Sequence, residues 1–142
     1  MSEAISAATL APGRAGGAPL SLEEPLSFWG GLDPTTGRII DRWHPQAGER
    51  VGGRILMMPS GRGSSSGSAA LAEALRLGVG PAAILLLKRD AIVIVGALVA
   101  MELYDRPCPV ALVATEDWAG LAAAGRLDVC AQARGTTIAL EA

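Results

Sequence analysis

The segment Pro59–Ser68, PSGRGSSSGS, concentrates serine and glycine around Arg62 between two apolar stretches. A serine hydroxyl at the start of a helix can cap that helix, contact a ligand, act as a nucleophile or accept a proton. To take a proton from carbon, a hydroxyl needs N–H donors, a positive helix end, a nearby guanidinium and exclusion of water. The segment offers the first two by its position, and Arg62 is a candidate for the third. It offers no hydrolase relay, because His44 is the only histidine and no GxSxG sequence is present, so it is at most half of a catalytic site.

A flexible linker and a nucleotide or phosphate site are the alternative interpretations of this segment. Glycine and serine runs are often linkers, but here a predicted strand enters the run and a predicted helix leaves it. Gly61, Gly63 and Gly67, followed by Asp90 23 residues after Gly67, resemble a dinucleotide fingerprint. The last glycine spacing in this chain is one residue longer than the fingerprint requires. A stand-alone nucleotide- or phosphate-binding module therefore remains an alternative.

The pattern around the segment predicts a strand, a turn and a helix. RILMMP is short, apolar and bounded by glycine and proline, which favours a buried strand ending near Met58. SAALAEALRLG has apolar residues near helical spacing and ends at Gly78, which predicts a helix from Ser68, capped by Ser66 or Ser68. Beyond it we expect a strand in 82–87, a helix in 94–103, a strand in 108–114, a short helix in 115–125 capped by Thr115 or Asp117, and two strands around a turn at Arg134 and Gly135.

Strands alternating with helices imply a small parallel sheet, so the predicted fold class is α/β in a single domain over residues 20–142. A short strand around residues 38–41, after the turn signal DPTTG, makes the start of this domain β-rich. Residues 1–19 are rich in alanine and glycine and contain two prolines. We therefore expect them to form a loose arm with at most one edge strand near Ala8–Leu10.

Composition excludes several functional classes. The 142 residues carry a formal charge of −2, so no basic field favours nucleic acid. The apolar run 82–101 has the length of a membrane span, but the charges at 88–90 divide it, and the N-terminus shows no secretory signal, so we expect a cytoplasmic protein. Cys108 and Cys130 are isolated and are expected to be buried thiols, and this chain alone cannot hold an iron–sulfur cluster.

Other conspicuous residues have structural explanations. Phe28 and Trp29 are expected to be core residues or anchors of a subunit interface. His44 either faces a site or packs as a structural histidine. Asp33 and Asp41 flank turns, and turn formation explains them without catalysis.

Three segments together resemble a known family. EPLSFWGGLDPTTGRIIDRWHP, GRILMMPSGRGSSSGSAALAEALRLGVGPAAILL and GALVAMELY are similar to the small, swivel-domain subunit of the aconitase X family, over about residues 20–113. The resemblance implies a swivelling β/β/α domain that closes over a larger catalytic subunit, whose own cysteines bind an iron–sulfur cluster or metal. It also implies a dehydratase of a small hydroxy acid. The SFWGG and triple-serine sequences look more like the enzymes that dehydrate cis-3-hydroxy-L-proline to Δ1-pyrroline-2-carboxylate, and mevalonate 5-phosphate is the alternative substrate.

The resemblance also assigns roles within the serine-rich segment. Aconitases use the first serine of a Gly-Ser-Ser-Arg segment as the base, and Gly63, Ser64 and Ser65 match its first three positions. Ser64 is therefore the expected proton acceptor. Ser66 stands where aconitases have arginine, so Arg62 and the helix N–H groups near Ser66 become candidates for binding the substrate carboxylate. Arg62, Gly63, Ser65 and Ser66 are the expected substrate-binding residues, and no metal ligand is expected on this chain.

Overall fold

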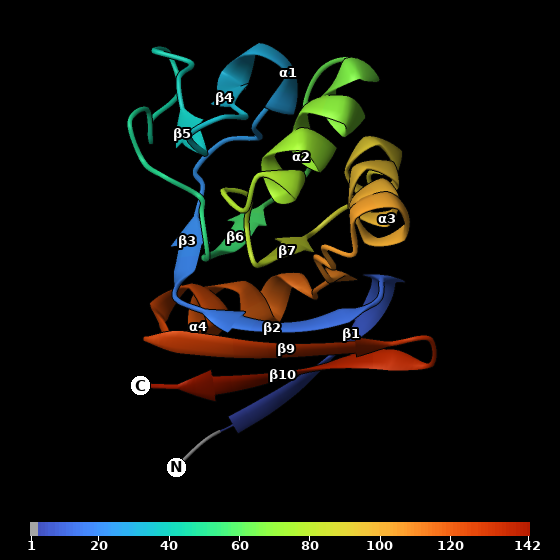
Figure 1. Ribbon diagram of the computed structural model, residues 1–142. Coiled ribbons are helices and arrows are strands. Elements are labelled where there is room, and N and C mark those ends of the chain that lie inside the picture. The colour runs from blue at the N-terminus through green and yellow to red at the C-terminus, as the bar shows by residue number, and fades with distance from the viewer. Residues whose placement is uncertain (1–2) are drawn as a thin grey trace.

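An eight-stranded sheet runs through the computed structural model, which describes residues 3–142 (Figure 1). The strands follow the spatial order β2-β9-β10-β1-β8-β7-β6-β3, and β4 and β5 form a separate small hairpin. The strands are β1 (Glu3–Ala11), β2 (Gly13–Gly17), β3 (Pro19–Ser21), β4 (Leu32–Asp33), β5 (Arg38–Ile39), β6 (Ile55–Met58), β7 (Ala83–Leu86), β8 (Val110–Leu112), β9 (Arg126–Gln132) and β10 (Gly135–Glu141). The helices are α1 (Phe28–Gly31), α2 (Ser66–Arg76), α3 (Ala91–Tyr104) and α4 (Trp118–Ala123), with a 3₁₀ turn η1 (Thr115–Asp117) before α4.

The sheet curls back on itself because its two edge strands are neighbours in sequence. β2 pairs antiparallel with β9 at one edge, and β3 pairs parallel with β6 at the other. Only Ala18 separates these two strands along the chain, so the edges of the sheet must lie close together. The result is a nearly closed barrel with its parallel strands on one side and its antiparallel strands on the other.

The parallel strands β6, β7 and β8 are covered on both faces. Side chains alternate along β6, so Leu56 and Met58 pack with α2 and α3, whereas Ile55 and Met57 pack with α4 and the strands β9 and β10. Figure 1 shows this arrangement, with α2 and α3 on one side of the parallel strands and α4 on the other. Burial on both faces explains why the sequences of these strands are continuously apolar and do not alternate between apolar and polar residues.

Helices α2 and α3 pack closely at Gly96. A Cβ atom at this position would lie 2.9 Å from the backbone oxygen of Ser68 and 3.0 Å from Cδ2 of Leu71. Because only glycine fits there, α3 comes into contact with the first turns of α2. The serine-rich segment that leads into α2 is thereby held against a second helix.

The structure confirms the α/β fold class and the strands and helices predicted from Arg38 onward, within a few residues of their bounds. The loose arm expected over residues 1–19 is wrong for residues 3–17, which form β1 and β2; residues 1–2 lie outside the described part. β1 is an inner strand that pairs with β10 along its first half and with β8 along its second. Within residues 3–142, no helix is long and apolar enough to cross a membrane.

Cys108 and Cys130 differ in burial and therefore in reactivity. Burial raises the pKa of the Cys108 thiol from 9.0 to about 12, whereas Cys130 is only half-buried. We expect a thiol reagent at about pH 8 to modify Cys130 in the folded protein and to reach Cys108 only after unfolding. Above about pH 9, unfolded Cys108 loses a proton that the folded protein retains, so the free energy of unfolding should fall with rising pH. Mass spectrometry of labelled peptides checks the expected labelling, and equal labelling of both thiols in the folded protein would contradict it. The decline in the free energy of unfolding at alkaline pH should be weaker in Cys108→Ala than in the wild type.

Candidate functional site

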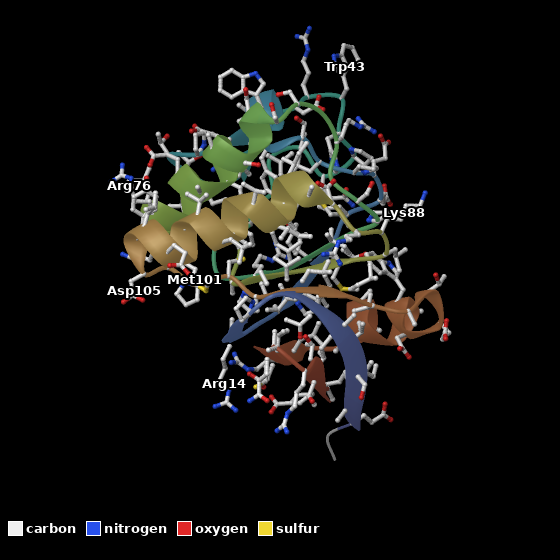
Figure 2. All side chains as sticks on the ribbon, turned by 90° about the vertical axis from the view of Figure 1, so that its right-hand side faces the viewer. Arg14, Trp43, Arg76, Lys88, Met101 and Asp105 are labelled. Atoms are coloured by element: carbon white, nitrogen blue, oxygen red, sulfur yellow. The ribbon has the colours of Figure 1, made fainter. Side chains whose placement is uncertain are left out.

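The serine loop, defined as Pro59–Ser68, leaves the parallel sheet at the carboxyl end of β6 and continues into α2. The backbone oxygen of Pro59 accepts hydrogen bonds from the N–H groups of Leu87 and Lys88, at 3.1 and 3.0 Å, so the loops that follow β6 and β7 lie together. Figure 2 shows Lys88 near the end of the molecule from which α2 and α3 start, with Arg76 and Asp105 at the opposite ends of these helices. The carboxyl edge of parallel strands is where α/β sheets bind ligands.

Asp90 links the serine loop to the start of α3 through hydrogen bonds of its carboxylate. Its Oδ2 accepts a hydrogen bond from the N–H of Gly61 at 2.9 Å, and its Oδ1 accepts from the N–H groups of Ile92 and Val93 at 2.9 and 3.2 Å. The carboxylate therefore caps α3 and joins it to the loop at the same time. These three bonds account for Asp90 as a helix cap and a link to the loop, which removes the need for a ribose hydroxyl as its partner and weakens the dinucleotide interpretation.

Replacing Asp90 by Ala should lower the free energy of unfolding by about 0.5–2 kcal/mol, the usual effect of losing a helix cap. Asp90→Ser should recover part of this loss, because a serine hydroxyl can cap α3 but is too short to reach Gly61 as well. Asp117 is the matched control, since it occupies the cap position of α4 without a capping hydrogen bond. Urea denaturation of the three variants tests this, and an Asp117→Ala variant as unstable as Asp90→Ala would contradict it.

Gly63 turns the loop outward. Its φ of +100° lies in the region that favours glycine, and a Cβ atom there would lie 2.6 Å from Oγ of Ser27. The three residues after it, Ser64, Ser65 and Ser66, are all exposed, as is Arg62. The structure therefore brings all five predicted site residues together on one exposed turn.

The first turn of α2 leaves N–H groups free for a ligand. The N–H groups of Gly67 and Ser68 are the first to bond back into the turn, to the oxygens of Ser64 and Ser65 at 2.9 and 3.2 Å. Those of Ser65 and Ser66 precede them and, in the described part of the chain, have no backbone acceptor. This is the positive end of an 11-residue helix, where an anion such as a carboxylate is stabilised.

The expected helix caps are wrong. Ser65 occupies the cap position of α2 without a side-chain hydrogen bond, and the hydroxyl of Ser68 donates instead to the oxygen of Ile92 at 2.8 Å, joining α2 to α3. Near α4, neither Thr115 nor Asp117 makes the expected capping bond. At the start of α2, hydrogen bonds between backbone N–H groups and backbone oxygens replace the expected side-chain caps. The hydroxyls of residues 64–66 are therefore not used for capping.

Arg62 is held by an acidic neighbour. Its Nη2 lies 3.6 Å from Oε1 of Glu24, and both side chains are about half exposed. A pair this exposed is weak, so a substrate carboxylate can compete with Glu24 for the guanidinium. The position suits a residue that binds an anion when one is present.

His44 is structural rather than part of the site. It is 5% exposed, its Nδ1 accepts a hydrogen bond from the N–H of Gln46 at 3.0 Å, and its Nε2 lies 3.1 Å from the oxygen of Glu24. The two bonds place the proton on Nε2, where it donates to that oxygen. The ring therefore ties the segment after β5 to the segment before α1.

The aspartates and aromatic residues are also accounted for. Asp33 accepts hydrogen bonds from the hydroxyl and the N–H of Thr35, which hold the pKa of its carboxyl below the ordinary value. Asp41 accepts a bond from the N–H of Trp43 at 3.0 Å, as expected for a turn. Phe28 is buried in the core, whereas Trp29 next to it is 62% exposed. Phe28 is therefore a core residue, which is one of the two roles expected for this pair.

No group of three or more histidine, cysteine, aspartate or glutamate side chains that could hold a metal ion is present within residues 3–142. The polar groups that the serine loop presents are serine hydroxyls, free backbone N–H groups and the guanidinium of Arg62. Such groups can bind a carboxylate and accept a proton, but they are poor ligands for iron or an iron–sulfur cluster.

Comparison with known proteins gives consistent results. The family model described as the aconitase X swivel domain matches residues 4–138. The chain is 45% identical, over 128 residues, to a cis-3-hydroxy-L-proline dehydratase of Pseudomonas aeruginosa, covering 85% of this chain and 22% of that protein. It is 38% identical to the phosphomevalonate dehydratase small subunit of Methanothermobacter thermautotrophicus, covering 80% of this chain and 87% of that one. The crystal structure of Thermococcus kodakaraensis aconitase X in its holo-form superposes with a TM-score of 0.80 at 25% identity, over 99% of both chains. The chain thus spans about a fifth of the first relative and most of the second.

Proposed function

The chain belongs to the aconitase X swivel-domain family, and we propose that it is the small subunit of a dehydratase, active only with a larger catalytic chain. The observation that carries this proposal is the exposed turn at Gly63–Ser66, which combines a hydroxyl with free helix N–H groups. That turn lacks one requirement of a serine base, the exclusion of water. A second chain that covers the loop would supply it.

Within such a complex, the residues of this chain would bind the substrate carboxylate and take a proton from the adjacent carbon. We propose that Ser64, deprotonated to its alkoxide, accepts the proton and becomes a neutral hydroxyl, since it follows the outward turn at Gly63 and its side chain is not used in capping α2. Arg62 and the N–H groups of Ser65 and Ser66 would hold the carboxylate, as charge-assisted hydrogen bonds. Any iron–sulfur cluster or metal would lie on the larger chain, where it would assist departure of the hydroxyl group.

For the substrate, we propose cis-3-hydroxy-L-proline, converted to Δ1-pyrroline-2-carboxylate. The support is the 45% identity to relatives from Pseudomonas aeruginosa and Hypocrea jecorina that carry the name cis-3-hydroxy-L-proline dehydratase. Mevalonate 5-phosphate is the second candidate, because the phosphomevalonate dehydratase small subunit matches this chain over 87% of its own length. Both substrates carry a carboxylate that suits the anion-binding turn.

The decisive experiment is to co-express this chain with a candidate large subunit, purify the complex and assay both substrates for dehydration. We expect the complex to act on the hydroxyproline and each chain alone to be inactive. The opposing result would be a chain that stays alone and binds a nucleotide or inorganic phosphate saturably. It would favour the stand-alone binding module instead.

A further inference from the structure

An apolar pocket of about 530 Å³ opens on the surface beside the serine loop. Its walls come from α1, from β4 and the residue after it, from the residue after β5, and from the first turns of α2. Trp29, Ile40 and Ala69 are among the residues that line it. We call it the Trp29 pocket. Its charged lining residue is Glu73, whose carboxylate is already paired with Arg76 on the same helix.

Large apolar side chains at this pocket are exposed to a degree that folding alone does not explain. Trp29 is 62% exposed and Ile40 is 52% exposed, although Phe28 beside them is buried. An apolar patch that includes an exposed tryptophan is typical of a protein interface. The pocket therefore has the chemistry of a docking surface for another polypeptide.

The Trp29 pocket and the serine loop cannot be covered independently. Ala69, on the wall of the pocket, directly follows Ser68, the last residue of the loop. A Cβ atom on Gly67 would lie 3.9 Å from the backbone nitrogen of Trp29, so α1 packs against the first turn of α2. Any chain that excludes water from the serine loop must pass over the edge of the pocket.

We propose that the Trp29 pocket is the docking site of the large subunit, which inserts an apolar segment there and covers the serine loop with the same surface. This inference rests on the proposed function. In the Pseudomonas aeruginosa relative the matched region is 22% of one chain, so a region like this one is joined there to a much larger polypeptide that could cover it. A second copy of this chain is a poorer occupant, because it would cover the serine loop and leave no access for the chain that holds the metal.

The outer face of α3 is the competing surface. Val95, Leu103 and Tyr104 are exposed there, and Leu103 is 69% exposed. However, two of these residues lie in the last turn of α3, next to Asp105, which Figure 2 places at the opposite end of the helix from the serine loop. A partner on that end of α3 would leave the serine loop open to water.

Two exposed alanines provide a matched test. Ala69 and Ala119 lie in the first turns of α2 and α4, both are exposed, and a glutamate at either position suits the start of a helix. Ala69→Glu should raise the dissociation constant for the large subunit by about tenfold or more, since it places a charge on the pocket wall. Ala119→Glu, on the other side of the sheet, should leave that constant within about twofold of the wild-type value.

Trp29→Ala is the second variant, because removing an exposed side chain preserves the fold, and circular dichroism checks this for each protein. Titration of each variant with the large subunit, together with sedimentation of this chain alone, gives the result. Three results would each overturn the inference. The first is wild-type affinity in both Ala69→Glu and Trp29→Ala, and the second is an Ala119→Glu variant that weakens binding as much as Ala69→Glu does. The third is self-association of this chain that Trp29→Ala abolishes. In those cases an active wild-type complex would show that the proposed function still stands, whereas its inactivity toward both substrates would refute that function separately.

Discussion

Replacing Ser64 by Ala should abolish turnover by the reconstituted complex while the fold, the assembly and the KM for substrate stay close to wild type. Loss of a general base lowers kcat by about a hundredfold to ten-thousandfold. The fold should not change, because Ser64 is exposed and does not cap α2. Steady-state kinetics with saturating large subunit measures this effect, and thermal unfolding checks the variant chain.

Ser65→Ala and Ser66→Ala are the matched controls, since both residues are exposed serines on the same turn. Their backbone N–H groups remain after substitution, so we expect an effect below about tenfold, mainly on KM. A Ser64→Ala complex with near-normal kcat would disprove the assignment of the base. If Ser65→Ala instead lost turnover, the base would be the neighbouring serine.

The strand, loop and helix around the serine loop could be predicted because their signals are local. RILMMP is apolar along its whole length, as a strand covered on both faces requires, and SAALAEALRLG has one apolar stripe that faces the core. The positions of Gly63 and Ser64 on the intervening turn followed from these two elements. The side-chain caps were wrong because several adjacent serines compete for that role and backbone oxygens within the first turn satisfy the same N–H groups.

The N-terminal strands could not be predicted because their stabilisation is not local. Residues 3–17 are rich in alanine and glycine, which have low strand propensity. Their partners β9 and β10 lie more than a hundred residues later in the chain, and Ile5 pairs with Ile138. Strand pairing across such a separation depends on the closure of the whole sheet, which a window of sequence does not show.

Sequence reasoning gave only part of the role of two further residues, Asp90 and Trp29. Asp90 was considered as part of a nucleotide fingerprint and as a charge that divides an apolar run, although an aspartate directly before an apolar run is a typical helix cap. Its second bond, to Gly61, depends on how two parallel strands bring their loops together. For Trp29, sequence reasoning left core and interface open, because neighbouring aromatic residues look alike until one is seen to be buried and the other exposed.

Gly96 and Gly120 should respond in opposite directions to the same substitution. Gly96→Ala places a Cβ atom 2.9 Å from the Ser68 oxygen, so α2 and α3 must separate, with an expected loss of about 1–3 kcal/mol in unfolding free energy. Gly120 has no atom within 4 Å of its Cβ position and lies in α4, so Gly120→Ala should gain about 0.4–1 kcal/mol. Chemical denaturation of both variants measures the difference. Because Ser68 ends the serine loop, Gly96→Ala should also lower kcat of the complex, and a variant as stable and active as the wild type would show that the contact between α2 and α3 does not position the loop.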